Sequence, residues 1–171
     1  MITLEELLDS GVQHARRILI EDRQKSLAHF YTLVLANGEM AVIPVQWQND
    51  IQKQLMIAGV RQVALERQAV MAMGIAEAWS LTAPDTVQGK AEGEAWMNNL
   101  PDPISQNPQR QECVMVFATY GERKIAKMLH IKRDKPGGRI VALQSNEMSG
   151  TIEGRLIDVL PRRQGAEREG V

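Results

Sequence analysis

The dipeptide Asn37-Gly38, with β-forming residues on both sides, constrains the fold of this chain more than any other feature. Residues 27–36 before it and residues 39–47 after it are rich in Leu, Val, Ile and aromatic side chains. Asn-Gly accepts the positive φ angles of a type I′ turn, whose twist matches that of two paired strands. The sequence therefore predicts a β-hairpin here. Because Pro44 has no N–H to donate, we expect the second strand at a sheet edge or a bulge.

Two further segments predict helices, one before and one after the hairpin. Thr3 and Glu6 form a capping box, and an apolar stripe at helical spacing follows it, so we expect a helix over residues 4–22. Asn49 or Asp50 can cap a second helix that runs to about residue 68. The apolar stripe of this second helix is imperfect and consists of Ile51, Leu55, Ala58 and Leu65.

From Met71 onward the sequence period changes from helical to alternating. Large side chains occupy every second position up to Leu81, and small ones stand between them. The alternation predicts a strand whose small face lets a helix approach closely, with a continuing helix as the alternative. Three more strands, joined by tight turns, are expected at residues 113–120, 123–133 and 139–144.

Together these elements predict an α+β domain in the order α-β-β-α-β-loop-β-β-β. We expect an antiparallel or mixed sheet of about six strands with the two main helices on one face. The domain should span residues 1–146, and residues 147–171 should form a polar C-terminal extension that is partly disordered. A loop rich in Pro, Gly, Asn and Asp is expected over residues 83–112, and a loop of this length is usually either functional or mobile.

Charge and cysteine content exclude several classes of protein. The 20 basic and 21 acidic side chains give a net charge of −1, which offers no general attraction to nucleic acid or to an acidic membrane surface. The single cysteine, Cys113, cannot form an intrachain disulfide, which suits a reducing compartment. The chain starts without a secretory signal, and no apolar stretch approaches the ~20 residues that span a bilayer. We therefore expect a cytoplasmic protein without a membrane partner.

No catalytic, nucleotide-binding or metal-binding motif stands out. The three histidines, His14, His29 and His130, are far apart, and neither an H-x3-H nor a C-x2-C pattern occurs. A P-loop, a G-x-G-x-x-G loop and a G-x-S-x-G elbow are also missing from the sequence. We expect neither a metal nor another cofactor.

Glu77 is the most unusual single residue, because it lies between Ile75 and Trp79 on the side of the strand where burial is expected. A buried carboxylate is costly unless it is paired, and we expect its partner to be Arg110 or His130. Two interpretations stay open: an internal ion pair that holds the strand register, or an acid or base at the mouth of a pocket. If the protein is an enzyme, the candidate catalytic residues are Glu77, Arg110, Glu112 and His130.

One resemblance involves the same region. Glu77-Ala78-Trp79, then a Pro-rich loop, then residues 107–112 (Asn-Pro-Gln-Arg-Gln-Glu) is similar to an arrangement in small uncharacterised bacterial or phage α+β proteins. The resemblance implies no activity. It agrees with a cluster of Glu77, Trp79, Arg110 and Glu112, which would form if the two strands are neighbours.

A second resemblance concerns nuclease chemistry. Pro84-Asp85 or Pro101-Asp102, followed by Glu122-Arg123-Lys124, resembles the PD-(D/E)xK nucleases, in which two carboxylates hold Mg²⁺ and the lysine steadies the attacking water. Here Glu122 falls in a predicted hairpin turn, whereas that family places the acid within a strand.

Residues 123–139 form a strongly basic predicted hairpin with a single acid, Asp134. A ribbon of this charge can lie along phosphates, although no exposed aromatic is interleaved for base stacking. The alternatives are a solvated face or a contact with the acidic 83–112 loop. The candidate nucleic-acid contacts are Arg123, Lys124, Lys127, Lys132 and Arg133.

The sequence therefore favours a non-enzymatic interaction or assembly protein, because it supplies surfaces more clearly than chemistry. Scarce aromatics, many Met and the open edge at Pro44 favour a homodimer or another protein partner. An enzyme of unknown class and a nucleic-acid binder are the alternatives.

Overall fold

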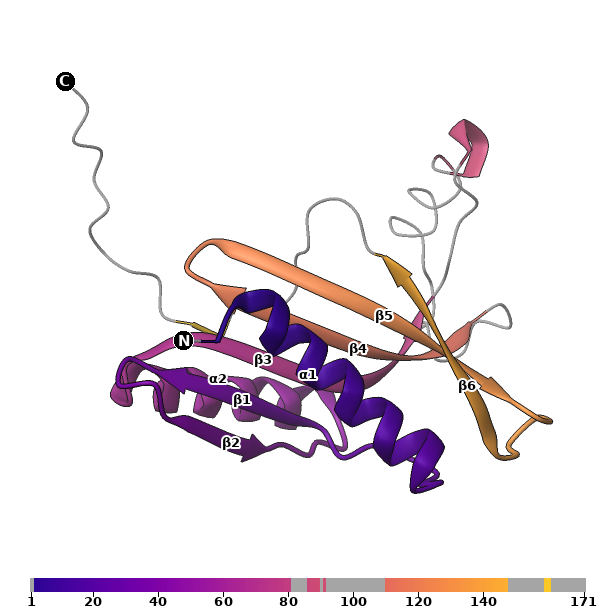
Figure 1. Ribbon diagram of the computed structural model, residues 1–171, viewed down its shortest axis with the longest axis horizontal. Helices are drawn as coiled ribbons and strands as arrows, with labels where there is room; N and C mark the ends of the chain where they lie inside the picture. Colours follow the sequence, from indigo (N-terminus) through magenta and orange to yellow (C-terminus); the bar gives the residue numbers. More distant parts are fainter. Residues whose placement is uncertain (1, 81–85, 90, 92–109, 148–158, 161–171) are drawn as a thin grey trace.

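The computed structural model describes residues 2–80, 86–89, 91, 110–147 and 159–160. Six strands form one antiparallel sheet in the order β2-β1-β3-β4-β5-β6, with helices packed against it (Figure 1). The α+β class, the six strands and the order of the described elements are as predicted. In chain order the elements are α1 (Leu4–Arg16), the π-helical turn η1 (Arg17–Glu21), β1 (Phe30–Leu35), β2 (Met40–Pro44), α2 (Asp50–Glu66), β3 (Ala69–Ser80), β4 (Gln111–Tyr120), β5 (Arg123–Arg133) and β6 (Ile140–Glu147).

Helix α1 begins at the predicted capping box. The Glu6 N–H donates to Thr3 Oγ1 (3.2 Å), and the Thr3 N–H donates to Glu6 Oε2 (2.7 Å). The apolar side of α1 packs on the sheet face that carries Met71, Met73 and Ile75 of β3, which we call the α1 face. The contact with this face involves the apolar residues of α1: Leu4, Leu7, Leu8, Val12 and Ala15.

Helix α2 lies on the opposite side of the sheet, so the prediction of two helices on one face was wrong (Figure 1). Successive side chains of a strand point to opposite faces. Ala72, between Met71 and Met73, accordingly belongs to a second core cluster with Ile57 and Val60 of α2, and we call this side the α2 face. Because both faces of the sheet carry apolar side chains, each face needs its own cover.

The predicted hairpin is present, and β2 lies at the edge of the sheet, the first of the two alternatives that Pro44 left open. The turn differs from type I′, because φ is positive at Gly38 (+87°) but not at Asn37. The Leu35 N–H donates to the Glu39 carbonyl (2.8 Å) and the Gly38 N–H to the Leu35 carbonyl (2.9 Å). This pattern is typical of a three-residue loop with a glycine bulge. Asn37 contributes through its side chain, whose Oδ1 accepts the Glu39 N–H.

Strand β3 alternates large and small residues as predicted, but a side chain covers part of its small face. A Cβ added at Gly74 would lie 2.2 Å from Cζ of Phe117, so the aromatic ring rests directly on the glycine. Phe117 also meets Tyr31 edge-on, with ring centroids 5.8 Å apart. The space left by the absent side chain of Gly74 is therefore filled by the Phe117 ring of the neighbouring strand β4, and not by a helix.

The ends of the predicted domain and loop need correction. Strand β6 extends to Glu147, and Val159 is buried in the core of the α2 face, so the packed domain includes residues beyond 146. Gln111 and Glu112 belong to β4, and the expected 83–112 loop therefore ends earlier. Most of that loop, and most of the expected extension, lie outside the described residues. Within the described chain, no helix is both long and apolar enough to span a membrane.

Candidate functional site

The predicted site lies where β3 continues beyond the end of β1. Pairing between β1 and β3 begins at Phe30 and Ile75, whereas β3 pairs with β4 as far as Ser80. The chain entering β1 covers the edge that β1 leaves open. The Glu77 N–H donates to Nε2 of His29 (3.0 Å), and the Leu27 N–H donates to Oε1 of Glu77 (2.6 Å). The segment before β1 therefore replaces a strand partner here.

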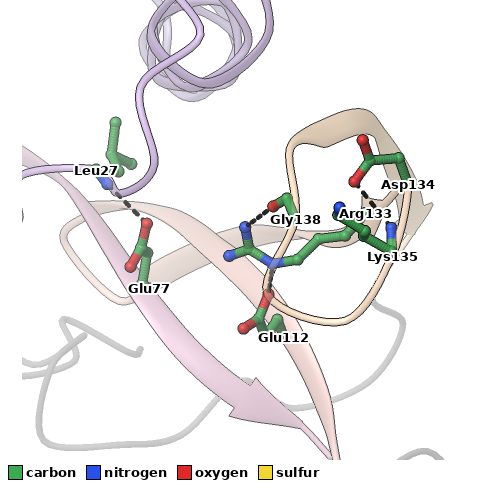
Figure 2. A network of polar contacts seen from close by, with 7 residues as sticks. All are labelled: Leu27, Glu77, Glu112, Arg133, Asp134, Lys135 and Gly138. Carbon is green, nitrogen blue, oxygen red and sulfur yellow. Dashed lines mark hydrogen bonds and ion pairs between the residues drawn. The ribbon is translucent and has the colours of Figure 1, made fainter.

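Glu77 is half-buried on the α1 face, and Figure 2 shows its carboxylate directed at Leu27. Loss of solvent raises the pKa of this carboxyl above its ordinary value, and the nearby Glu112 raises it further. The Leu27 N–H and the charge of Arg133 act in the opposite direction. The hydrogen bond to Leu27 differs from the Arg110 or His130 partner that the sequence suggested. A backbone group that approaches from another segment cannot be identified from sequence spacing.

Glu112 and Arg133 form an ion pair beside Glu77, between β4 and β5. Arg133 Nε donates to Glu112 Oε2 (2.6 Å), and Arg133 Nη1 donates to the Gly138 carbonyl (2.8 Å). Figure 2 shows the guanidinium lying between these two acceptors. Arg133 therefore links the start of β4 to the turn between β5 and β6. The hydrogen bond to the Gly138 carbonyl fixes the orientation of the guanidinium.

Arg110 completes the cluster by stacking on an aromatic ring. Its Cζ lies 4.7 Å from the ring centroid of Trp79, and Trp79 is directly opposite Glu112 in the β3–β4 register. Strands β3 and β4 are neighbours, so the structure brings Glu77, Trp79, Arg110 and Glu112 to one end of the sheet. A shallow hollow of about 270 Å³ lies here, lined in part by His29, Glu77, Trp79, Glu112, Ile131 and Arg133.

Two residues near this hollow limit its chemistry. The thiol of Cys113 is buried, which raises its pKa, and it lies 3.5 Å from the Ala78 carbonyl. A protonated, enclosed thiol is a poor nucleophile. Burial and the charge of Lys53 lower the pKa of His29, whose Nε2 already accepts the Glu77 N–H. The hollow can hold a polar group against Glu77, but these neighbours supply it with no activated nucleophile.

His130 does not join the cluster. It lies opposite Cys113 in the β4–β5 register and points to the α2 face, the side away from Glu77. Its side chain is buried, and its Nδ1 has no hydrogen-bond partner among the described residues. Burial, together with the charge of Lys132, lowers its pKa, so the ring is neutral at pH 7.

The cations of β5 divide between the two faces of the sheet. Arg123 and Lys127 lie on the α1 face and form ion pairs with Glu5 and Asp9 of α1, the second at 2.6 Å. Arg133, also on this face, pairs with Glu112. The remaining two candidates, Lys124 and Lys132, alternate with these residues and therefore belong to the α2 face. The predicted basic ribbon is thus split, and carboxylates neutralise its α1 side.

The nuclease-like arrangement is only partly within the described chain. Glu122 lies in the turn between β4 and β5, as predicted, and this turn is at the opposite end of β4 from Glu112. Asp85 and Asp102 lie outside the described residues. Among the described residues, no group of three or more His, Cys, Asp or Glu side chains is arranged to hold a metal ion.

The outer side of α2 is a second candidate surface. The stripe Ile51, Leu55, Ala58 and Leu65 faces away from the sheet and is exposed. The buried side consists instead of Ile57, Val60 and Ala64, with Met56 and Val63 partly buried beside them. The sequence did contain a sign of this arrangement: α2 has apolar residues on both sides, and a helix that packs on one sheet face can bury only one of them.

Comparison with protein-family models, with curated proteins and with solved structures gave no match to this chain. The resemblance to small bacterial or phage proteins therefore stays a prediction.

Proposed function

We propose that this protein acts by binding another protein chain, and that the outer side of α2 is its contact surface. The observation that carries the proposal is the exposure of three large apolar side chains on one stripe: Ile51 is 71% exposed, Leu55 67% and Leu65 56%. Contiguous apolar patches on a protein surface commonly mark interaction sites. Helix α2 therefore carries apolar residues on an outer side as well as on the side that packs against the sheet.

The contacts around Glu77 support an interaction role over catalysis. Glu112 is paired with Arg133, Arg110 stacks on the ring of Trp79, and the Glu77 carboxylate accepts a backbone N–H. Each of these side chains therefore already has a partner within the chain: two pairs link side chains, and Glu77 is held by the segment before β1. Such an arrangement favours a structural role, in which the cluster holds the end of the sheet together, over a poised acid or base.

The charge distribution on β5 also favours a protein partner over a nucleic acid. Phosphate binding depends on cations that are free to replace counterions. On the α1 side, Arg123, Lys127 and Arg133 already contact carboxylates of the same chain. The net charge of −1 supplies no additional attraction.

The proposal is tested by site-specific photo-crosslinking of the full chain in the cells that produce it. A photoreactive amino acid placed at Leu55 should give a covalent adduct with one discrete protein chain. The adduct should disappear when the flanking residues Ile51 and Leu65 are both changed to Gln, because the contact depends on the whole stripe.

The matched control carries the same photoreactive residue at Val141, which is also exposed (44%) but lies on β6. Adduct formation at Leu55 but not at Val141 supports the proposal. No adduct at Leu55, or equal adducts at both positions, contradicts it.

A further inference from the structure

We infer that this protein binds one soft monovalent metal ion, Cu(I), on the α2 face of the sheet, through the side chains of Cys113, Met115, Met128 and His130. The four residues come from the neighbouring strands β4 and β5 (Figure 1). Cys113 is directly opposite His130 in the register, and Met115 is opposite Met128. Because positions two apart on a strand point to the same face, all four lie together on one face. This site is independent of the protein contact proposed for α2.

The hydrogen-bond pattern of the sheet brings each pair close together. The N–H of Glu77 bonds the segment before β1, so the backbone groups of Ala78 point the other way, toward Cys113 of β4. The backbone groups of Cys113 therefore point to β3, and Cys113 and His130 occupy a non-hydrogen-bonded position. Cα atoms in such a pair are about 4.5 Å apart, the closer of the two cross-strand distances in an antiparallel sheet. The methionine pair, two residues along, holds the same kind of position.

One metal ion can contact both members of the Cys113–His130 pair. Bonds from a metal to a thiolate sulfur or an imidazole nitrogen are roughly 2.0–2.3 Å long, so an ion between the two side chains reaches both. The Cys113 thiol lies 3.5 Å from the Ala78 carbonyl, and binding turns it toward His130. Met115 and Met128 start about 7 Å further along their strands, and their long, flexible side chains can extend to the same ion. Both are half-buried, which makes them the ligands nearest to solvent.

His130 supplies the observation that points to a ligand. The residue is 5% exposed, and its Nδ1 has no hydrogen-bond partner among the described residues. A buried nitrogen without a partner is costly, whereas a metal ion would satisfy its lone pair. Cys113 beside it is 1% exposed, so an ion bound between the two side chains is shielded from water.

The set of donor atoms selects a soft ion. A thiolate and two thioethers favour Cu(I), and imidazole also suits copper, whereas Mg²⁺, Ca²⁺ and Mn²⁺ prefer carboxylate, carbonyl and water oxygens. The described register neighbours of the four residues on this face include Ala76, Ala78 and Gln144, and none of the described neighbours is acidic. The site therefore offers sulfur and nitrogen without a carboxylate.

Burial also constrains the charge of the ion. Cu(I) replaces the proton of the Cys113 thiol, and this proton is released to solvent, so the net charge of the buried site does not change. A divalent ion would add one uncompensated positive charge, which is costly in the interior. Lys132, two positions from His130 on the same face, would increase that cost. The site therefore favours a monovalent ion.

The first test measures the transfer of Cu(I) to the purified full chain from its bicinchoninate complex, without oxygen. The wild-type chain should take up one Cu(I). The double variant Met115→Leu, Met128→Leu keeps the side-chain volumes and should raise the Kd for Cu(I) by at least about 10-fold. Cys113→Ser should raise it by at least about 100-fold. The matched control, Met40→Leu at an exposed methionine of β2, should leave the Kd unchanged.

The second test uses the wild-type ligands, so it does not depend on whether Cys113→Ser folds. The full chain is labelled at its methionine methyl groups, and one equivalent of Ag(I) is added as a redox-inert ion of the same charge. The NMR signals of Met115 and Met128, assigned with the two single Met→Leu variants, should shift. The signals of the other methionines should stay in place.

Three results would overturn the inference. They are no uptake of Cu(I) from bicinchoninate, an uptake that the double methionine variant leaves unchanged, and Ag(I)-induced shifts spread over all methionines. An excess of Zn(II) should not displace Cu(I) from the wild-type chain, because thioethers are poor ligands for harder ions. Displacement by Zn(II) would contradict the selection of a soft ion.

Discussion

Replacing Gly74 by Ala should destabilise this protein through a single, well-defined clash. An added Cβ would lie 2.2 Å from Cζ of Phe117, and ordinary contact begins at 3.4 Å, so the ring or the strand must move by 3.4 − 2.2 = 1.2 Å. Phe117 is 1% exposed and cannot escape into solvent. Overpacking of this kind costs up to about 3 kcal/mol. Ala is better than Gly in a strand by about 0.5–1 kcal/mol, which leaves a net loss of about 2 kcal/mol.

The assay is thermal and urea unfolding followed by circular dichroism. A loss of about 2 kcal/mol lowers the Tm of a chain of this size by about 4–8 °C. Phe117→Leu in the Gly74→Ala background should recover part of the loss. The two changes should therefore be coupled by at least about 1 kcal/mol in a double-mutant cycle.

Gly59→Ala is the matched control, since nothing lies within 4 Å of its added Cβ. This position is inside a helix, so the substitution should raise stability by up to about 1 kcal/mol. The explanation fails if Gly74→Ala leaves the Tm unchanged, or if its effect simply adds to that of Phe117→Leu.

Three further predictions concern the candidate site and α2. Burial raises the pKa of Glu77, so the folded chain binds this proton more tightly than the unfolded chain, and stability is lost as pH rises through the raised pKa. The Glu77→Gln variant should therefore be at least as stable as wild type at pH 7, and this advantage should vanish below pH ~4. An equal loss of Tm at every pH would contradict this prediction. Urea unfolding of Glu112→Gln, Arg133→Gln and the double variant should give a coupling energy of about 1 kcal/mol that weakens in high salt. A coupling energy of zero would show that the ion pair is not formed in solution. Asn49→Ala removes the side-chain oxygen that accepts the Gln52 N–H (2.9 Å) and should lower the free energy of unfolding by about 1 kcal/mol. Asn49→Asp should retain the cap, so equal losses in both variants would exclude a capping role.

The local structure of the fold was predictable from sequence because it depends on near neighbours. The Thr3–Glu6 capping box, the turn at Asn37-Gly38 and the two-residue alternation of β3 each involve groups a few positions apart. Each of them depends on a local requirement: a satisfied N–H, a positive φ or side chains on alternate faces. The residues within a few positions meet that requirement, so the sequence predicts it. Pro44 likewise limited its strand to a sheet edge or a bulge, because a missing N–H is a property of one residue.

The candidate site was only partly predictable for the same reason. Alternation identified Glu77 as a carboxylate on an apolar strand face, and the neighbouring strands β3 and β4 brought it close to Glu112 and Arg110. Its contact, the Leu27 N–H, lies 50 positions away in an irregular segment. A backbone donor carries no sequence signature, so no spacing rule could have selected it.

What only the tertiary structure decided is which surface each apolar group faces. Helix α2 has apolar residues on both sides, and its periodicity alone does not distinguish the side toward the core from the side toward solvent. The packing of Ile57 and Val60 against Ala72 and Phe117 settles that choice and leaves Ile51 and its stripe outside. The same long-range packing places α1 and α2 on opposite faces, because an apolar sheet must be covered on both sides. The sequence determined the elements, and the competition between their apolar surfaces determined the arrangement.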